Sequence, residues 1–162
     1  AELKYIDGEQ RVLVNGEDVT QKIRTPKMSM AASKVSALPA VRDFLFELQR
    51  KIARENDVIM DGRDIGTVVL PDAQVKIYLT ASPQERARRR HAELLQKGEK
   101  ASFEEVLADI VERDYNDSHR AVAPLRQAQD AILVDTTHLD LEKSVERIHQ
   151  LIKERQSHVD RL

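Results

Sequence analysis

From Asp57 onward the sequence alternates short apolar runs with segments of helical pattern, and this alternation limits the fold more than any other feature. The apolar runs are Val58–Met60, Val75–Leu79 and Ala131–Val134. Runs of this length, separated by helices, are typical of strands in a parallel sheet covered on both faces. The sequence therefore predicts an α/β fold for residues 56–162.

The helices between these runs are indicated by their termini. Ser82-Pro83-Gln84-Glu85 and Ser102-Phe103-Glu104-Glu105 both have the capping-box pattern, and Gly98 is placed to end the first helix. A last helix is expected from about Leu141 to Arg155, with residues 156–162 frayed.

The first 55 residues predict a separate, smaller part. Asp7-Gly8 and Asn15-Gly16 follow short apolar stretches, which predicts a small antiparallel meander. Thr25 as N-cap and Pro26 as first helical residue predict a helix that ends near Pro39, where a second helix begins. In this second helix we expect one buried stripe at spacings of four, three and four: Val41, Leu45, Leu48 and Ile52.

Composition narrows the classes of function. The chain has 26 Lys and Arg against 28 Asp and Glu. It therefore lacks the strong positive charge that attracts many nucleic-acid and membrane binders to their partners. It has no cysteine, which excludes disulfides, cysteine-ligated zinc and thiol catalysis. The five histidines have no metal-site spacing, and no apolar run approaches the ~18 residues of a membrane span. We expect a cytoplasmic protein without a metal site, a nucleic-acid partner or a membrane partner.

Three charged residues crowd the end of the first apolar run. Asp61, Arg63 and Asp64 surround Gly62, at the carboxyl edge where parallel sheets bind their ligands. A single Asp-Gly there is typical of a solvated turn. Three charges converging at one strand end favour a binding site.

A second group of charges lies on the helix that Ser82 opens. Arg86, Arg89 and Arg90 fall on one helical face. Like charges on one face repel unless an anion neutralises them, and guanidinium groups suit phosphate oxygens. A phosphate site and a merely solvated or nucleic-acid-binding basic face fit this pattern equally well.

A third group follows the next helix, whose apolar stripe is Phe103, Val106 and Ile110. If the helix continues, Arg113, Asp117 and Arg120 stand on one face, with the carboxylate between two cations. A ligand clamp has this pattern, but so does an internal salt-bridge ladder, which is common on exposed helices.

Four segments, in their order and spacing, resemble the bacterial cytidylate kinase family. They are Ile23-Arg24-Thr25, Asp61 to Val69, Pro71-Asp72-Ala73 and Glu112 to Leu125. The resemblance covers nearly the whole chain. It implies a P-loop-kinase-like parallel sheet flanked by helices, a CMP-binding insert of small β meander plus two helices over 1–55, and a lid over about 82–120.

The resemblance also implies roles for individual side chains. Ser33, Arg42 and Asp64 match the positions that read the cytosine ring, where a carboxylate accepts from the amino group and an arginine donates to ring acceptors. Arg113 and Arg120 match positions that hold the acceptor phosphate.

The remaining matches concern the sugar, the lid and the edge of the site. Asp117 matches the position that contacts the sugar hydroxyls. Arg86, Arg89 and Arg90 match the lid. In the family, the lid closes over the nucleotide phosphates and supplies charge to the transferring phosphoryl group. Arg24 and Arg63 match positions near the substrate, and Asp61 is a further candidate.

The chain departs from the family in one respect. The resemblance implies a donor site built on a Gly-rich loop ending in Gly-Lys-Ser/Thr, yet none of the five glycines here precedes a lysine. In the family that loop and its flanking strands precede the point where this chain begins. We therefore expect an incomplete sheet and a chain that is inactive alone, whereas the complete enzyme transfers phosphate from ATP, with Mg²⁺, to CMP or dCMP.

The missing loop is consistent with three kinds of chain. In the first, the chain is a fragment, and a missing N-terminal segment completes the sheet. In the second, the chain is a truncated product, and a second chain or a swapped copy supplies the missing strand. In the third, the protein folds another way and only binds nucleotide. A non-catalytic nucleotide- or RNA-binding module that uses the face of Arg86, Arg89 and Arg90 is the alternative function.

Overall fold

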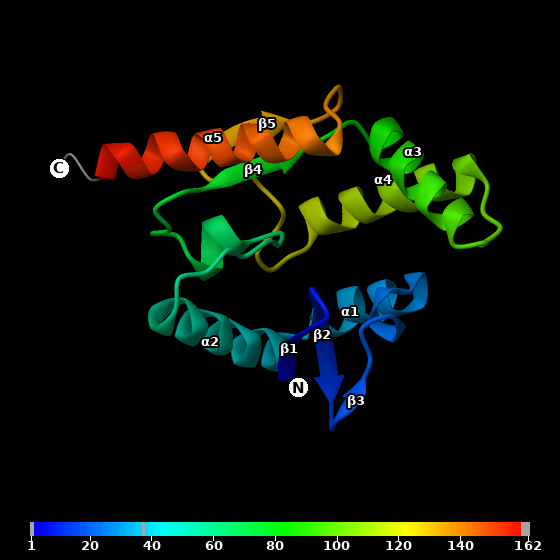
Figure 1. The fold of residues 1–162 in the computed structure, drawn as a ribbon, viewed down its shortest axis with the longest axis horizontal. Helices are drawn as coiled ribbons and strands as arrows, with labels where there is room; N and C mark the ends of the chain where they lie inside the picture. The colour runs from blue at the N-terminus through cyan, green and yellow to red at the C-terminus, as the bar shows by residue number, and fades with distance from the viewer. Residues whose placement is uncertain (1, 37, 160–162) are drawn as a thin grey trace. The chain divides into compact units, whose positions relative to one another are not determined.

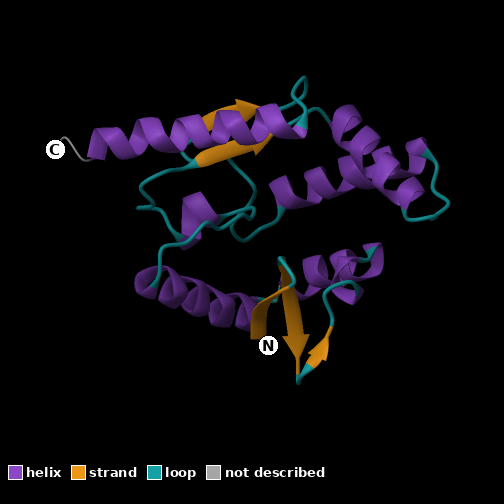
Figure 2. Cartoon of the chain, in the orientation of Figure 1, coloured by secondary structure: helices purple, strands orange, loops and turns teal. Residues whose placement is uncertain are grey.

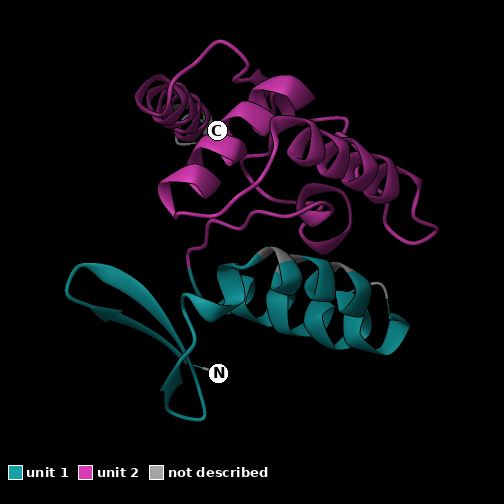
Figure 3. Cartoon of the chain, turned by 90° about the vertical axis from the view of Figure 1, so that its right-hand side faces the viewer, with its two compact units in different colours: residues 1–56 teal, residues 57–162 magenta. Residues whose placement is uncertain are grey.

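The computed structural model describes residues 2–36 and 38–159, which form two compact units divided between residues 56 and 57 (Figure 3). The first unit contains a three-stranded antiparallel sheet, a short 3₁₀ helix and two α-helices. In chain order these elements are β1 (Glu2–Ile6), β2 (Glu9–Val14), β3 (Glu17–Asp18), η1 (Lys22–Arg24), α1 (Pro26–Ser36) and α2 (Pro39–Glu55).

The turns and the cap of α1 in the first unit form where the sequence predicts them. The strands β1, β2 and β3 form a meander in that order (Figure 2). Both connecting turns have positive φ at their central residues: 53° and 80° at Asp7 and Gly8, and 52° and 83° at Asn15 and Gly16. Such turns match the twist of the strands they join. At the start of α1, the Thr25 hydroxyl accepts from the backbone N–H of Met28 at 3.3 Å.

The prediction of a buried stripe on α2 is wrong. Leu45, Leu48 and Ile52 are all exposed, and α2 has no buried residue among those described. The reason is the size of the unit: α1 and three short strands offer too little surface to cover a helix of 17 residues.

The second unit has a parallel pair of strands with helices between and after them (Figure 1). Its elements are a π-helix, η2 (Ile65–Val69), then β4 (Ile77–Thr80), α3 (Pro83–Gln96), α4 (Phe103–His119), β5 (Ile132–Asp135) and α5 (Leu141–Val159). β4 pairs with β5 in parallel, from Ile77 opposite Ile132 to Thr80 opposite Asp135. The mixed α/β class and two of the three predicted strands are therefore confirmed.

The third predicted strand is absent. Val58–Met60 is irregular, and Ile59 is 96% exposed. A strand requires a lateral partner for its backbone hydrogen bonds, and the described residues provide none for this segment. An apolar run alone does not make a strand.

The helix termini agree with the sequence signals, with one exception. Ser102 and Glu105 form both halves of the capping box of α4. Gly98 has a φ of 75°. Its backbone N–H and that of Glu99 donate to carbonyl oxygens in the last turn of α3. Ser82 forms only the N-cap half at α3, since its own N–H donates to Thr137 and the carboxylate of Glu85 pairs with arginines.

The core of the second unit lies between α3 and α4. Ala87 and Leu94 of α3 are buried against Val106 of α4, with Phe103 and Ile110 partly buried beside them. The predicted stripe of α4 is therefore confirmed, and this contact determines which polar residues of the two helices meet.

The last helix is longer than expected. α5 continues to Val159, so the expected fraying is wrong for residues 156–159, and residues 160–162 lie outside the described part. No helix within the described residues is long and apolar enough to cross a membrane.

Candidate functional site

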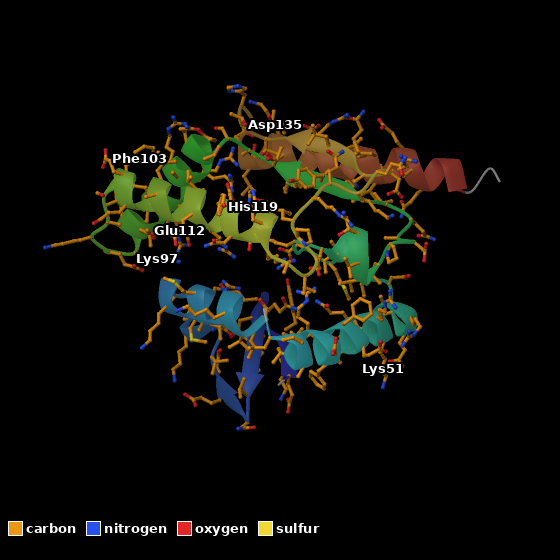
Figure 4. The ribbon with its side chains drawn as sticks, turned by 180° about the vertical axis from the view of Figure 1, so that it is seen from behind. Lys51, Lys97, Phe103, Glu112, His119 and Asp135 are labelled. Atoms are coloured by element: carbon orange, nitrogen blue, oxygen red, sulfur yellow. The ribbon has the colours of Figure 1, made fainter. Side chains whose placement is uncertain are left out.

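The second unit brings together charged residues from two distant segments, the loop after Met60 and the C-terminal end of α4. Arg63 donates from Nε to Oδ2 of Asp117 at 2.8 Å, and Nε of Arg113 lies 3.8 Å from the same oxygen. The side chain of Asp117 is only 12% exposed. In Figure 4 the labels on Phe103 and His119 mark the two ends of α4, and the cluster lies at the His119 end.

Arg120 joins this cluster from outside the helix. α4 ends at His119, and Arg120 has extended dihedrals of φ −62° and ψ 143°. Its Nε donates to the carbonyl oxygen of Ala123 at 2.6 Å, and its Nη2 lies 3.6 Å from Oδ1 of Asp64. The helix stops before Arg120, so the condition for Arg113, Asp117 and Arg120 to share one helical face, a helix that continues to Arg120, is not met.

We call this group the α4-end cluster: Arg63, Asp64, Arg113, Asp117 and Arg120. Three guanidinium groups face two carboxylates, which leaves a net positive charge. Nη2 of Arg120 is buried and has no hydrogen-bond partner among the described residues. A buried donor without an acceptor costs free energy, so an anion that accepts from Arg120 is stabilised here.

The three arginines of the α3 face are paired within the chain. Nη1 and Nη2 of Arg86 donate to the two carboxylate oxygens of Asp114 on α4, the first at 2.9 Å, and its Nε donates to the carbonyl of Ala81 at 3.0 Å. The hydrogen bonds that Arg86 donates to Asp114 raise the pKa of Arg86 above its usual value. Arg86 thus braces α3 against both α4 and the end of β4.

The other two arginines of this face also have partners. Arg89 donates to the carboxylate of Glu85 at 3.0 Å and to the backbone carbonyls of Thr136 and Leu139. Arg90 pairs with Glu93 at 2.8 Å on the exposed side of α3. We call Arg86, Arg89 and Arg90 the α3 face.

The remaining predicted residues lie elsewhere. Asp61 is exposed, three positions before Asp64. Arg24 ends η1, Arg42 lies in the first turn of α2, and Ser33 lies in α1 with a side chain outside those that the structure describes. These last three belong to the first unit, so their part in the site stays a prediction.

Comparison with known proteins identifies the family. The cytidylate kinase family model matches residues 1–154. The chain belongs to the cytidylate kinase family. Two relatives illustrate the match: the cytidylate kinase of Carboxydothermus hydrogenoformans is 55% identical over 153 residues, and that of Thermosipho melanesiensis is 49% identical over 154 residues.

Membership of the cytidylate kinase family makes this chain a relative of nucleotide kinases, as the resemblance predicted. The alignments cover 93% and 95% of this chain but 69% and 71% of the two relatives. The cytidylate kinase of Lactobacillus gasseri is similar, at 50% identity over 96% of this chain and 67% of that protein.

Two polar partners in this region were missed at the level of sequence. Asp114 accepts hydrogen bonds from both terminal nitrogens of Arg86, which lies 28 residues away in the sequence. No local spacing predicts such a pair. Ala123 takes part only through its backbone carbonyl, which accepts from Arg120. Every residue has such a carbonyl, so the sequence does not indicate this contact.

Proposed function

We propose that the α4-end cluster binds the acceptor nucleotide, CMP or dCMP, of a cytidylate kinase reaction. The observation that carries this proposal is the buried Nη2 of Arg120, which has no hydrogen-bond partner among the described residues. An acceptor phosphate satisfies this nitrogen and balances the net positive charge of the cluster.

The roles proposed within the cluster are those that the family resemblance implies, and they agree with the chemistry of the side chains. Arg113 and Arg120 take the phosphate, and Arg63 lies near it through its bond to Asp117. Asp117 accepts from the sugar hydroxyls, since a carboxylate has about four lone-pair sites and Arg63 uses one oxygen. The family resemblance supports this division of roles.

Cytosine recognition is proposed for Asp64 together with Ser33 and Arg42. The carboxylate of Asp64 lies next to Arg120 and belongs to the same cluster. A carboxylate can accept from the cytosine amino group, which supports this role for Asp64. Arg24 and Asp61 are proposed at the edge of the same site, on the family resemblance alone. The first unit, about residues 1–55, is the proposed CMP-binding insert.

The α3 face is proposed to act in the lid, residues 82–120. Arg90 is the most readily released of its arginines, because exposed ion pairs such as the one with Glu93 contribute roughly 0 to 1 kcal/mol. Arg86 and Arg89 have several internal acceptors each and must give some of them up to reach a phosphate.

The donor side, ATP with Mg²⁺, does not fit the residues of this chain. The sequence holds no Gly-rich loop ending in Gly-Lys-Ser/Thr. The described residues hold no group of three or more acidic or histidine side chains that suits a metal ion. The proposed P-loop-kinase-like sheet requires more strands than the parallel pair of β4 and β5. The rest of the protein or a second chain would supply them.

Nucleotide titration tests the proposal. The binding of CMP, dCMP, UMP and AMP to the complete enzyme is measured by calorimetry. The phosphorylation of each nucleotide by the same enzyme is assayed with ATP and Mg²⁺. We expect CMP and dCMP to be preferred, with Asp64→Ala weakening CMP binding and Arg88→Ala, which removes an exposed arginine paired with Glu85, leaving it unchanged.

Three outcomes contradict the proposal. A preference for UMP or AMP excludes cytosine recognition, and unchanged CMP affinity in Asp64→Ala removes Asp64 from the site. Binding of single-stranded RNA with steep salt dependence and no response to CMP favours the RNA-binding alternative.

A further inference from the structure

The loop that follows α4 contains an unusual backbone conformation next to the proposed phosphate site. We propose that the carbonyl oxygen of Ala123, held by a left-handed conformation at that residue, positions Arg120 for the acceptor phosphate. This inference rests on the proposed function, because it concerns how Arg120 is aimed and not what it binds.

The loop folds back on the end of α4 through two hydrogen bonds. Arg120 leaves the helix in an extended conformation, and its Nε donates to the carbonyl of Ala123 at 2.6 Å. The backbone N–H of Leu125 then donates to the carbonyl of Asp117 at 2.8 Å. The loop is therefore tied to the same helical turn that carries Asp117.

The conformation of Ala123 is costly for an alanine. Its φ is 48°, in the region where the Cβ of an L-residue is crowded by its own backbone. The other described non-glycine residues with positive φ are Asp7 and Asn15, residue types that tolerate this region and that lie in tight turns before glycine. Strained conformations of this kind persist only where the surrounding structure imposes them, and they are enriched at functional sites.

The carbonyl determines where the guanidinium group points. The guanidinium is planar, so a bond at Nε fixes the plane and direction of its two terminal nitrogens. Nη2 is held 3.6 Å from Oδ1 of Asp64, which is beyond hydrogen-bond distance, and it is buried without a hydrogen-bond partner among the described residues. Without the Ala123 carbonyl, Arg120 is free to close on Asp64, and its guanidinium then becomes less available to phosphate.

The test compares two substitutions of similar size at Ala123 in the complete enzyme, to Val and to Asn, with Gly as a further control. Ala123→Val is β-branched and disfavours positive φ, whereas Ala123→Asn is tolerated there. We expect Ala123→Val to lower CMP affinity about tenfold and to raise KM for CMP without changing KM for ATP. Ala123→Asn and Ala123→Gly should retain the affinity of the original protein.

A double-mutant cycle tests whether the effect passes through Arg120. In an Arg120→Ala background, Ala123→Val should cause no further loss of CMP affinity. If Ala123→Val does not fold, Pro124→Gly loosens the same loop and should lower CMP affinity only when Arg120 is present.

The outcomes separate this inference from the proposed function. Absence of CMP binding by the original protein overturns the proposed function and this inference with it. CMP binding that is unaffected by Ala123→Val, equally weakened by Ala123→Asn, or weakened by the same factor with and without Arg120 overturns the inference alone.

Discussion

The α3 face and the α4-end cluster are both rich in arginine, yet their guanidinium groups are in different states. Every arginine of the α3 face has a carboxylate partner within the chain, and Arg86 and Arg89 also donate to backbone carbonyls. In the α4-end cluster, three arginines share two carboxylates, and one terminal nitrogen of Arg120 is buried without an acceptor among the described residues.

This difference shows that the number of arginines on a surface does not identify an anion site. What matters is whether their donors are already satisfied, because a satisfied guanidinium must lose a bond before it gains one, whereas a buried unsatisfied donor gains directly. On this ground the α4-end cluster is ready for a phosphate, and the α3 face requires rearrangement.

The largest expected effect separates the two regions by ligand affinity. Arg120→Ala should lower CMP affinity by about 100-fold, or about 2.7 kcal/mol, which lies within the roughly 1.5 to 3 kcal/mol that a hydrogen bond to a charged group contributes. The matched control is Arg88→Ala on α3, which should leave the affinity unchanged. Calorimetric titration provides the measurement, and equal losses in the two variants contradict the comparison.

The second effect concerns stability at the α4 end. Asp117→Asn removes the carboxylate that Arg63 and Arg113 share, and we expect the free energy of unfolding to fall by about 2 kcal/mol. This is less than for a fully buried pair, because the Arg63 side chain is 40% exposed. Urea denaturation measures the change, and a loss as small as that in Glu93→Gln, at an exposed pair, argues against a structured cluster.

The third effect ranks the arginines within the α3 face. Arg86→Ala should lower the free energy of unfolding by about 1 kcal/mol, since it removes the brace to Asp114, although more than a third of both side chains is exposed. Arg90→Ala should cost less than about 0.5 kcal/mol. If thermal or urea denaturation shows equal costs, the distinction between a bracing and an available arginine is wrong.

The smallest effect is a pH dependence of the α3 face. Hydrogen bonds from Lys97 and then Arg90 lower the pKa of Glu93 from its usual 4.5. A carboxyl with a lowered folded-state pKa stabilises the fold above its unfolded pKa, and this contribution is lost as the pH falls through the folded-state value. The difference in Tm between the original protein and Glu93→Gln should therefore shrink from about pH 5 to about pH 3. A constant difference over that range shows that the exposed pair has no such linkage.

Interactions between near neighbours in the sequence were predicted well. The two turns of the meander, the N-cap of α1, the capping box at Ser102 and the glycine after α3 depend on residues within about five positions of one another. Their preferred conformations are properties of short peptides, so the sequence pattern is enough.

Predictions that needed distant partners were less accurate. Val58–Met60 was expected to be a strand and the α2 stripe to be buried, and both depend on what packs beside them. The shared face of Arg113, Asp117 and Arg120 depended on a helix that continues to Arg120, but α4 ends at His119 and Nε of Arg120 donates to the Ala123 carbonyl.

The sequence by itself determined the family, the turns and helix ends, and the presence of two arginine-rich groups at positions that match a nucleotide site. Only the tertiary structure decided which of those arginines are satisfied, since Arg63 meets Asp117 across 54 residues and Arg86 meets Asp114 across 28. Helical spacing predicts which side chains share a face of one helix, but the partner of a charge depends on the packing of separate elements. Here the packing of α3 on α4 pairs Arg86 with Asp114, while the loop after α4 leaves Arg120 with a donor that no described residue satisfies.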